Sequence, residues 1–292
     1  MTGNTQATTP ILVLGGTGKT GRRVVQRLRA RGIPTRLGSR SAQPPFDWDD
    51  RSTWAPALDG VKSAYVSYYP DVAVPGAAET VAAFAKLAVN SGVPRLVLLG
   101  GRGEAEAERV EQAVRAAGAD LTIVRSTWFA QNFSEDYMLE YVLSGEVTLP
   151  AGDTPEPFVD ADDIADVAVA ALTDERHIGQ LYELTGPRLL TFAAATAEIA
   201  KAAGREVRYV PVSVEEYAAA AAEQGVPGEV IDLLAYLFSE VLDGRNAHLA
   251  DGVQRALGRE PRDFADFARD AAASGVWDAA PMSIRPSERS SA

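Results

Sequence analysis

Residues 11–21 read ILVLGGTGKTG, and this stretch decides the fold because it joins an apolar run to three regularly spaced glycines. Its first four residues are apolar without interruption, which is typical of a parallel strand buried on both faces. Gly15, Gly18 and Gly21 then allow a sharp turn, a close approach of the backbone to a ligand and tight packing of the next helix. The stretch therefore predicts a strand, a glycine turn and a helix.

The glycine turn predicts a binding site for phosphate groups. At the start of a helix, unpaired backbone N–H groups and the helix dipole both favour an anion. Besides Gly15, the residues that would form this site are Thr17, Gly18, Lys19 and Thr20. A P-loop would need a further glycine five residues before Gly18, where Val13 stands, so we expect a dinucleotide rather than ATP. A tight turn without a ligand is the structural alternative.

A second strand is expected at residues 34–39, and the residues that end it bear on the choice of cofactor. NAD-binding chains place an acid there for the ribose 2′-hydroxyl. This chain has Ser39 and Arg40 instead, and both can donate hydrogen bonds to the 2′-phosphate of NADP. The sequence thus favours NADPH over NADH, with a solvated loop arginine as the alternative.

The composition restricts the class of protein. The chain has 292 residues, 46% of them hydrophobic, which suffices for one large and one smaller domain. Its 28 basic and 40 acidic residues give a net charge of −12, which makes nucleic acid an unsuitable partner. The chain has no cysteine, and it shows neither a cleavable leader nor the roughly 20 apolar residues of a membrane span. We expect a cytoplasmic protein without a membrane partner.

Strand-like and helix-like segments alternate along the first half of the chain. Strands are expected at residues 65–69, 95–100 and 121–125, and helices at residues 75–90 and 104–117. This alternation predicts an α/β fold: a Rossmann-like doubly wound parallel sheet with helices on both faces. After about residue 149 the pattern loosens into helices with short strands, at residues 181–184 and 207–210.

The pattern suggests a division into three parts. We expect an NAD(P)-binding Rossmann domain at residues 1–155 and a smaller, mostly helical substrate lobe at residues 156–275, with one or more segments returning to the first domain. Residues 276–292, rich in Ser, Pro and Arg, are expected to be a flexible tail.

Longer motifs make the chain resemble the NmrA-like, atypical short-chain dehydrogenase/reductases. Besides the glycine turn, they are residues 125–133 (RSTWFAQNF), 158–165 (FVDADDIA) and 182–187 (YELTGP). The likeness runs from residue 11 to about residue 271. Residues 38–41 (GSRS), 46–48 (FDW) and 53–54 (TW) are similar to the branch that contains the ergot-alkaloid reductases, which reduce a cyclic iminium with NADPH.

The resemblance implies where a cofactor and a substrate would lie. Asp47 and Trp48 would lie near the adenine, and the loops after Tyr69 and Gly100 would border the ribose and pyrophosphate. Residues from Thr127 through Trp128 to Phe129 would approach the nicotinamide. Phe129 and Asn132 follow an expected strand at the sheet edge where open α/β folds bind ligands, and they are assigned to the substrate.

Several residues in these motifs have structural interpretations. Trp54 is expected to pack in the core, and Arg125 to pair with a carboxylate behind the sheet. Asp160 is expected to cap a helix, with Asp163 as a first-turn acid that the helix dipole favours.

The chain lacks the Tyr-x-x-x-Lys pair with which classical members of this superfamily protonate an alkoxide. It has four lysines, and the residues four positions before them are Gly15, Leu58, Ala82 and Ala197. Hydride transfer to a cationic C=N bond gives a neutral amine and needs no general acid. A reduced quinone is a weak base that water can protonate. The missing pair is thus compatible with reduction of an iminium or a quinone.

If a side chain assists, Tyr68, Tyr69 and Tyr137 are the candidate proton donors. Glu135 or Asp136 could attract a cationic substrate. His177 and His248 are expected in surface connections without a catalytic role. No metal site is expected, because the chain has no cysteine and its acids are scattered.

Two functions remain open. The first is an NADPH-dependent reductase of a small conjugated or cationic molecule, such as an iminium, quinone or enone. The second is a non-catalytic NADP(H)-sensing regulatory protein, which could use a protein partner or a second copy of the chain. A reductase needs an open apolar pocket beside Trp128, Phe129 and residues 217–237, whereas a sensor can fill it.

Overall fold

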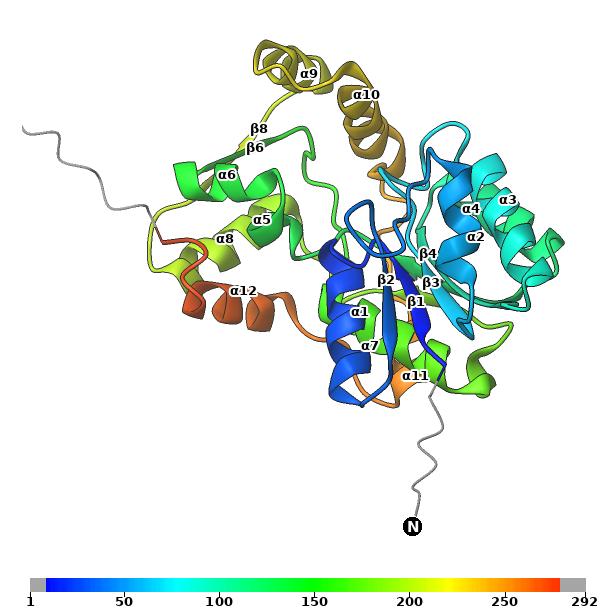
Figure 1. Cartoon of the computed structure of the whole chain (residues 1–292). Coiled ribbons are helices and arrows are strands. Elements are labelled where there is room, and N and C mark those ends of the chain that lie inside the picture. Colours follow the sequence, from blue (N-terminus) through cyan, green and yellow to red (C-terminus); the bar gives the residue numbers. More distant parts are fainter. Residues whose placement is uncertain (1–8, 279–292) are drawn as a thin grey trace, which may run out of the picture.

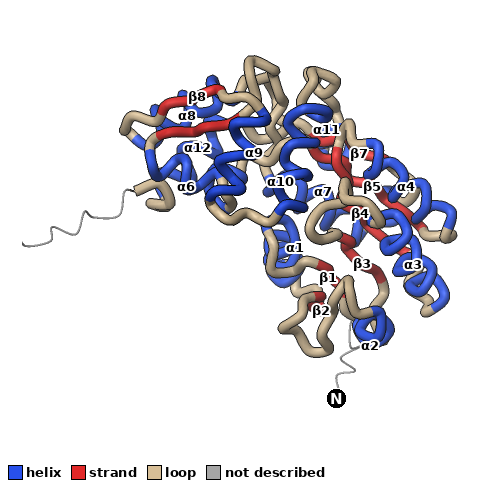
Figure 2. Tube along the Cα trace, turned by 90° about the horizontal axis from the view of Figure 1, so that it is seen from above, coloured by secondary structure: helices blue, strands red, loops and turns tan. Residues whose placement is uncertain are grey.

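A six-stranded parallel sheet with helices on both faces forms the centre of the computed structural model, which describes residues 9–278 (Figures 1 and 2). The strand order is β2-β1-β3-β4-β5-β7, so the predicted doubly wound α/β sheet is confirmed. The bounds are β1 Ile11–Leu14, β2 Thr35–Gly38, β3 Ser63–Val66, β4 Arg95–Gly101, β5 Asp120–Ser126 and β7 Leu181–Leu184. β2 and β3 flank β1 on opposite sides, and open α/β sheets bind ligands beyond the strand ends at such a switch point.

The apolar run of β1 faces two separate cores. Ile11 and Val13 pack with one set of helices, and Leu12 and Leu14 with the other, and all four side chains are fully buried. The first face carries α1 Lys19–Ala30, α7 Ala161–Thr173 and α11 Gly252–Leu257. The second carries α2 Trp54–Leu58, α3 Ala77–Asn90 and α4 Ala105–Ala116. Short 3-10 helices lie at η1 Arg51–Thr53 and η2 Glu175–His177.

A second, smaller lobe has its own core and its own two-stranded parallel sheet, β6 Glu146–Leu149 with β8 Arg208–Pro211. Aromatic rings fill this core, for example Phe158 and Phe192, whose ring centroids are 4.9 Å apart. Its helices are α5 Asn132–Glu135, α6 Met138–Ser144, α8 Phe192–Ala203, α9 Val214–Glu223, α10 Gly228–Tyr236 and α12 Phe264–Ala273, with a π-helical turn η3 at Leu237–Val241. The lobe lies beside the α1 end of the sheet (Figure 1).

The two cores do not divide at residue 155, where the domain boundary was expected, because each contains residues from both sides of it. Residues 138–149, which precede it, pack in the lobe, whereas α7, β7 and α11, which follow it, pack on the sheet. Trp277 lies within the expected tail, yet it is buried, and its indole N–H donates to the carbonyl of Phe133 at 2.8 Å. The tail therefore cannot begin at residue 276, and residues 279–292 lie outside the described residues.

Two local expectations need correction. The strand expected at residues 65–69 is β3, Ser63–Val66, so Tyr68 and Tyr69 lie in the loop after it. His177 is buried rather than at the surface. Its Nδ1 forms a hydrogen bond with the hydroxyl of Tyr182, 2.7 Å away. Among residues 9–278, no helix is both long and apolar enough to cross a membrane.

Candidate dinucleotide and substrate site

The glycine turn between β1 and α1 is held by its own backbone. Gly15 has a φ of +63°, a left-handed conformation that favours glycine, and its carbonyl accepts from Gly18 N at 2.9 Å. A Cβ on Gly21 would overlap the carbonyl oxygen of Gly15, so only glycine lets α1 start this close to β1. Gly15 and Gly21 are therefore required by the fold itself.

Gly18 differs from these two glycines. Its backbone is extended, with φ −78°, which any residue adopts, and it is exposed. A Cβ at this position would have the Gly15 carbonyl oxygen as its nearest neighbour, 3.3 Å away. Thr17 beside it is also exposed. The open space at Gly18, at the N-terminus of a twelve-residue helix without first-turn acids, fits a phosphate group.

Thr20 does not offer its hydroxyl to this space. The side chain is buried toward the sheet, where the hydroxyl of Tyr65 donates to Thr20 Oγ1 at 2.9 Å. Burial raises the pKa of Tyr65, which stays neutral. Any contribution of Thr20 to an anion comes from its backbone N–H.

Lys19 ties the glycine turn to the segment that follows β5. Its ammonium donates to Asn132 Oδ1 at 2.7 Å, pairs with Asp136, and lies 5.9 Å from the ring centroid of Phe129. The structure thus brings Lys19, which was expected to bind the cofactor, together with Phe129 and Asn132, which were expected to bind the substrate. It also occupies Asn132 and Asp136 with a cation that belongs to the protein.

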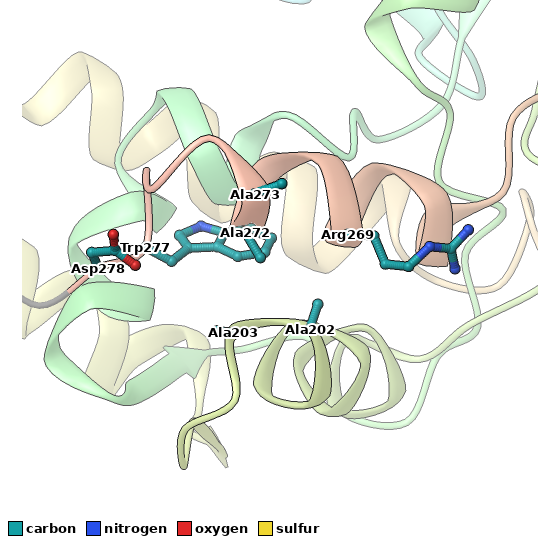
Figure 3. A pocket seen from close by; sticks show the side chains of 7 residues that line it. All are labelled: Ala202, Ala203, Arg269, Ala272, Ala273, Trp277 and Asp278. Carbon is teal, nitrogen blue, oxygen red and sulfur yellow. The ribbon is translucent and has the colours of Figure 1, made fainter.

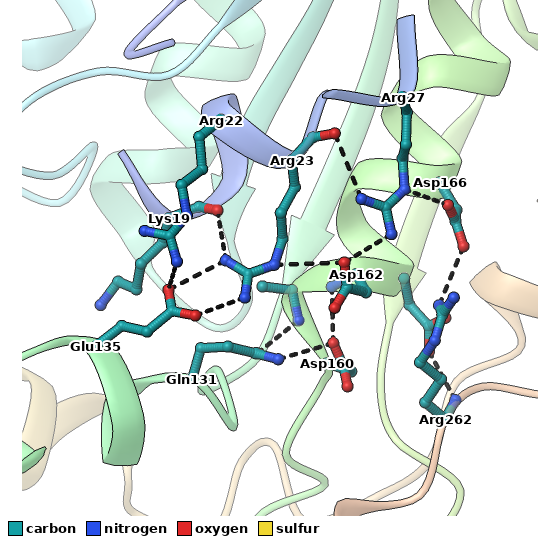
Figure 4. Close-up of polar contacts among 12 residues, drawn as sticks. Lys19, Arg22, Arg23, Arg27, Gln131, Glu135, Asp160, Asp162, Asp166 and Arg262 are labelled. Atoms are coloured by element: carbon teal, nitrogen blue, oxygen red, sulfur yellow. Dashed lines mark hydrogen bonds and ion pairs between the residues drawn. The ribbon is translucent and has the colours of Figure 1, made fainter. Parts of the chain in front are cut away.

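Glu135 is likewise occupied, by arginines of α1 (Figure 4). Arg23 holds its carboxylate with two hydrogen bonds, of 3.0 and 2.5 Å, and Arg22 pairs with it as well. Burial works to raise the pKa of Glu135, but Arg23 and Arg22 outweigh it and lower the pKa. The suggestion that Glu135 or Asp136 attracts a substrate cation is therefore wrong, because both already have partners.

The ion pairs between arginines of α1 and acids continue along α7 (Figure 4). Arg27 pairs with Asp162 at 2.6 Å and with Asp166 at 2.5 Å. Asp160 accepts from Asp162 N at 2.7 Å, which confirms the predicted helix cap. Gln131 bridges Asp160 and Ala161 N, at 2.8 and 2.7 Å, and so fixes the segment after β5 against α7.

Ser39 and Arg40 follow β2 at the edge where the glycine turn lies. Gly15 N donates to Gly38 O at 3.0 Å, which sets the two loops side by side. Arg40 is exposed, and its side chain has no ion pair or hydrogen bond with residues 9–278. Ser39 Oγ has a long contact of 3.4 Å with Ser41 Oγ. Both side chains are thus available to a phosphate.

Asp47 and Trp48 belong to an aromatic cluster beside this loop. Trp48 lies 4.9 Å from Phe46 and 5.0 Å from Tyr68 between ring centroids, and its indole N–H donates to Ser67 O at 3.3 Å. The backbone carbonyl of Asp47 accepts from the indole of Trp54 at 2.8 Å, and Trp54 is buried as predicted. Tyr68 thus has a packing role, whereas Tyr69 is 74% exposed.

The ends of β4 and β5 lie next to each other, since Gly101 pairs with Ser126. Gly100 is buried, and its missing side chain leaves room for Glu111, whose Oε1 would lie 3.1 Å from a Cβ there. Glu111 binds Arg125 through two hydrogen bonds of 2.7 Å, so the predicted carboxylate partner of Arg125 is confirmed. Gly100 itself faces this ion pair.

Thr127 and Trp128 form the wall between sheet and lobe. The Thr127 hydroxyl is hydrogen-bonded to the buried carboxyl of Glu156, and burial raises the pKa of Glu156 to about 7. The Trp128 ring packs on Phe192 and Phe238, with centroids 5.4 and 5.0 Å away. Phe238 therefore fills part of the space that the predicted pocket would occupy.

Apolar surface remains beside this wall on α10. The helix reads GEVIDLLAY, none of its residues is buried, and it lies on the side where the sheet strands end (Figure 1). Tyr137 lies in the lobe with Tyr141, 6.4 Å away between centroids, and its buried hydroxyl has no partner among the described residues. Burial raises the pKa of Tyr137, so it stays protonated.

A surface hollow with a defined lining lies elsewhere, in the lobe between α8 and α12 (Figure 3). It has a volume of about 340 Å³ and is lined mainly by alanines. None of the residues predicted to bind cofactor or substrate lines it. In residues 9–278, no group of three or more His, Asp or Glu side chains could hold a metal ion.

Comparison with known proteins bears on what this geometry serves. A model described as the NmrA-like family matches residues 105–266, which is more than half of the chain. The chain belongs to the NmrA-like family. The expected resemblance is thereby confirmed.

Relatives of this NmrA-like chain match it over nearly its whole length. The NAD(P)H azoreductase of Xenophilus azovorans is 33% identical, covering 90% of this chain and 98% of that protein. The agroclavine dehydrogenase of Claviceps fusiformis is 30% identical over 91% and 98%, which is consistent with the expected branch. The solved triphenylmethane reductase of Citrobacter sp., complexed with NADP(H), shares the fold with a TM-score of 0.71 and 21% identity, over 90% of this chain and 99% of that one.

Proposed function

We propose that this NmrA-like protein is an NADPH-dependent reductase of small conjugated or cationic organic molecules, with an iminium, quinone or enone as acceptor. As an NAD(P)H-dependent oxidoreductase it agrees with its full-length relatives, which include an azoreductase and a clavine dehydrogenase. The observation that carries the proposal is the open backbone at Gly18 together with Arg40, which is exposed and has no side-chain partner among residues 9–278. The first suits a pyrophosphate and the second a 2′-phosphate.

The chain's own residues would hold the cofactor in four places. The backbone of Thr17 and Gly18 would face the pyrophosphate, and Ser39 with Arg40 the 2′-phosphate. Asp47 and Trp48 would lie near the adenine, and Thr127 and Trp128 near the nicotinamide. A bound NADPH supplies a hydride. Lys19 acts indirectly, because its bonds to Asn132 and Asp136 hold the segment after β5 against the turn.

The substrate would lie between the strand ends and α10. The half-buried apolar residues of α10, with Phe129 and Trp128, offer a wall suited to a flat conjugated molecule. Tyr137 is the tyrosine whose buried, unpartnered hydroxyl keeps it a candidate donor, whereas Tyr68 packs on Trp48 and Tyr69 projects into solvent.

The second candidate function is NADP(H) sensing without turnover. It is favoured by the contact of Phe238 with Trp128, which fills part of the expected pocket. The two functions share the cofactor site and differ in chemistry. A sensor binds NADPH but passes its hydride to none of the acceptors.

A calorimetric titration with NADPH and, in parallel, NADH at one fixed salt concentration tests the cofactor site. We expect NADPH to bind at least tenfold tighter, which is about 1.4 kcal/mol. Acceptors are then screened by loss of NADPH absorbance. Tight binding with no oxidation by an iminium, quinone or enone would favour the sensor, and absence of binding would end both proposals.

A further inference from the structure

Glu104 is a buried acid at the sheet edge that the proposed cofactor and substrate contacts leave unused. It directly precedes α4, but its side chain does not cap the helix. Instead the carboxyl folds back over Gly101, the last residue of β4, so that a Cβ on Gly101 would overlap it. Glu104 is 9% exposed, and its Oε2 is buried without a hydrogen-bond partner. Only glycine at position 101 makes room for this carboxyl.

Asp71 approaches Glu104 from the loop after β3. Its Oδ1 accepts from Ala73 N at 2.8 Å, and its charge acts on both Glu104 and Lys19. Burial raises the pKa of Asp71, against the effect of the Ala73 and Val72 amides and Lys19. Burial, and then the charge of Asp71, raise the pKa of Glu104 well above its ordinary value. The pair therefore retains a proton where an ordinary carboxyl would have lost it.

Groups from every neighbouring element leave Glu104 without a cation. Arg102 points away and donates to the carbonyls of Asn246 and His248 at 3.2 and 3.0 Å. Arg245 is engaged by Asp243 at 2.8 Å. Two further groups lie near the Glu104 and Asp71 pair. One is Tyr236 of α10, and both its burial and the charge of Glu104 raise the pKa of Tyr236. The other is Glu106 on α4. Within residues 9–278, no basic side chain forms an ion pair with Glu104.

The position of Glu104 matches the edge at which the substrate would lie. β4 ends beside β5, and Thr127 follows directly after β5. Tyr236 of α10 contacts the start of α4, where its hydroxyl forms a hydrogen bond with the backbone of Ala105. Glu104 thus lies between the strand ends and the half-buried apolar residues of α10, and its Oε2 has no partner among residues 9–278.

We propose that Glu104 is the proton donor of the reduction and stands in for the missing Tyr-x-x-x-Lys pair, with Asp71 as the residue that positions its proton. This inference rests on the proposed reductase function. In an enone or quinone, the hydride adds to the electrophilic end of the conjugated system, and the π electrons move to the carbonyl oxygen. The O–H bond of Glu104 then breaks and its proton passes to that oxygen. NADPH has lost two electrons, the acceptor has gained them, and water reprotonates Glu104.

The donor role separates neutral from cationic acceptors. An enone or quinone becomes an oxyanion when it accepts a hydride, so a buried proton donor accelerates its reduction. A cationic acceptor becomes neutral and takes no proton. If the carboxyl were instead a counter-ion for a cationic substrate, its removal would harm the cationic acceptor and spare the neutral one. The two roles thus give opposite patterns.

The first test measures the proton without any cofactor. Infrared difference spectra at neutral pH between the wild type and Glu104→Gln should show a protonated carboxyl C=O band that only the wild type has, because Glu156, whose pKa is also raised, contributes equally to both proteins and cancels. In Asp71→Asn the band should titrate at a lower pH, because the neighbouring charge is gone. Glu79→Gln, an exposed acid on α3, is the matched control and should keep the wild-type band. The absence of a difference band between the wild type and Glu104→Gln at neutral pH would overturn the proposal.

The second test measures kcat with a quinone, an enone and a triarylmethane cation as acceptors, at saturating NADPH. We expect Glu104→Gln to lower kcat for the neutral acceptors by about 10²-fold or more and to leave the cation within about twofold of wild type. Equal loss on all acceptors indicates a structural role, and selective loss on the cation a counter-ion; either overturns the donor assignment.

The failures of the two proposals are distinguishable. If none of the acceptors oxidises NADPH with the wild type, the reductase function fails and the donor role fails with it. If the wild type reduces neutral and cationic acceptors and Glu104→Gln does the same, the reductase function stands and only the donor role is lost. NADPH affinity, measured in each variant, verifies that the cofactor site is intact.

Discussion

The two sides of the glycine turn treat charged and polar groups in opposite ways. On the paired side, where α1 faces α7 and residues 131–136, each basic residue of α1 from Lys19 to Arg27 has a carboxylate partner within the protein. On the open side, which comprises Thr17, Gly18 and Arg40 and the acids Asp71 and Glu104, the described structure gives no ion pair.

This difference separates groups that hold the scaffold from groups that are kept for a ligand. An ion pair within the protein satisfies both charges and fixes two elements against each other. An unpartnered group in a folded protein gains nothing from the fold, and a buried one costs stability. We therefore expect changes on the paired side to lower stability with little effect on binding, and changes on the open side to do the reverse.

The largest expected effect is at Asp163 on α7, which is linked to the paired side through Asp166: Arg259 contacts both aspartates, and Asp166 also pairs with Arg27 of α1. This aspartate is fully buried, lies 2.7 Å from Arg259, pairs with Arg262 and accepts from Arg262 N at 2.7 Å. Asp163→Ala leaves these donors without their acceptor and should lower the free energy of unfolding by about 3 kcal/mol. Urea denaturation measures this loss, and NADPH affinity of the folded variant should stay at the wild-type value.

The matched control for Asp163 is Asp266, whose ion pair with Arg269 is exposed on α12. Asp266→Ala should cost less than about 1 kcal/mol, because solvent screens an exposed pair. Equal losses in the two variants would show that the burial of Asp163 does not determine how much its ion pairs contribute to the free energy of unfolding.

On the open side, the largest effect should come from Gly18. Gly18→Val keeps an extended backbone and meets only Gly15 O, so the fold should tolerate it. The side chain would, however, stand where a pyrophosphate lies. We expect NADPH to bind about 100-fold more weakly, or ~2.7 kcal/mol, with an unchanged circular dichroism spectrum.

Gly21 provides the contrast to Gly18 within one motif. Gly21→Ala should destabilise the fold, because its Cβ would overlap the Gly15 carbonyl. A folded Gly18→Val protein with normal NADPH affinity would show that the pyrophosphate does not bind at Gly18.

The sequence predicts the local features of the fold better than it predicts the contacts on either side of the glycine turn. The alternating segments and the uninterrupted apolar β1 predict the sheet, and local patterns predict the Asp160 cap and the burial of Trp54. These features depend on neighbours along the chain. The paired side joins residues such as Arg23 and Glu135, which are 112 positions apart, so Glu135 was wrongly expected to be free. A signal was present: two arginines of α1 and two aspartates of α7 share a spacing of four, namely Arg23, Arg27, Asp162 and Asp166.

The Glu104 and Asp71 pair has no comparable signal in the sequence. Each lies in a loop without a motif, and only the parallel pairing of β3 with β4 brings the two loops to one edge. Glu156 is similar, because its carboxyl reaches Thr127 only after the lobe has folded against β5. Burial, which gives these acids their properties, depends on tertiary packing that residue types alone do not specify.

Arg40 should show a smaller and more selective effect. Arg40→Ala removes a charge that has no partner in residues 9–278, so stability should not change. NADPH binding should weaken about tenfold, or ~1.4 kcal/mol, while NADH binding stays the same, since only NADPH carries the 2′-phosphate. Calorimetric titration of both nucleotides measures this. Arg31→Ala, an exposed change at the other end of α1, is the control; an equal loss of NADH affinity would make Arg40 a residue of the fold.

The smallest expected effect is a difference in how stability depends on pH, and it compares one acid from each side. The pKa of Glu135 is lowered in the folded protein, so its contribution is present above its unfolded value, near 4.5, and is lost as pH falls through the folded pKa. The pKa of Glu104 is raised, so the fold favours its protonated form and loses stability as pH rises above 4.5 toward the folded pKa.

The corresponding glutamine variants should therefore shift the melting temperature in opposite directions at neutral pH. Glu135→Gln should lower Tm by ~2–4 °C, for about 1 kcal/mol, and Glu104→Gln should raise it by a similar amount. The Glu104 difference should shrink as the pH falls toward 4.5, below which its carboxyl is protonated in the folded and unfolded states alike, whereas the Glu135 difference should shrink only as the pH falls further, through the lowered folded pKa. Thermal scans from pH 4 to 8 measure the two curves. If both variants lost stability at neutral pH, Glu104 would be a structural acid like Glu135. It would then no longer belong with the groups that are kept for a ligand.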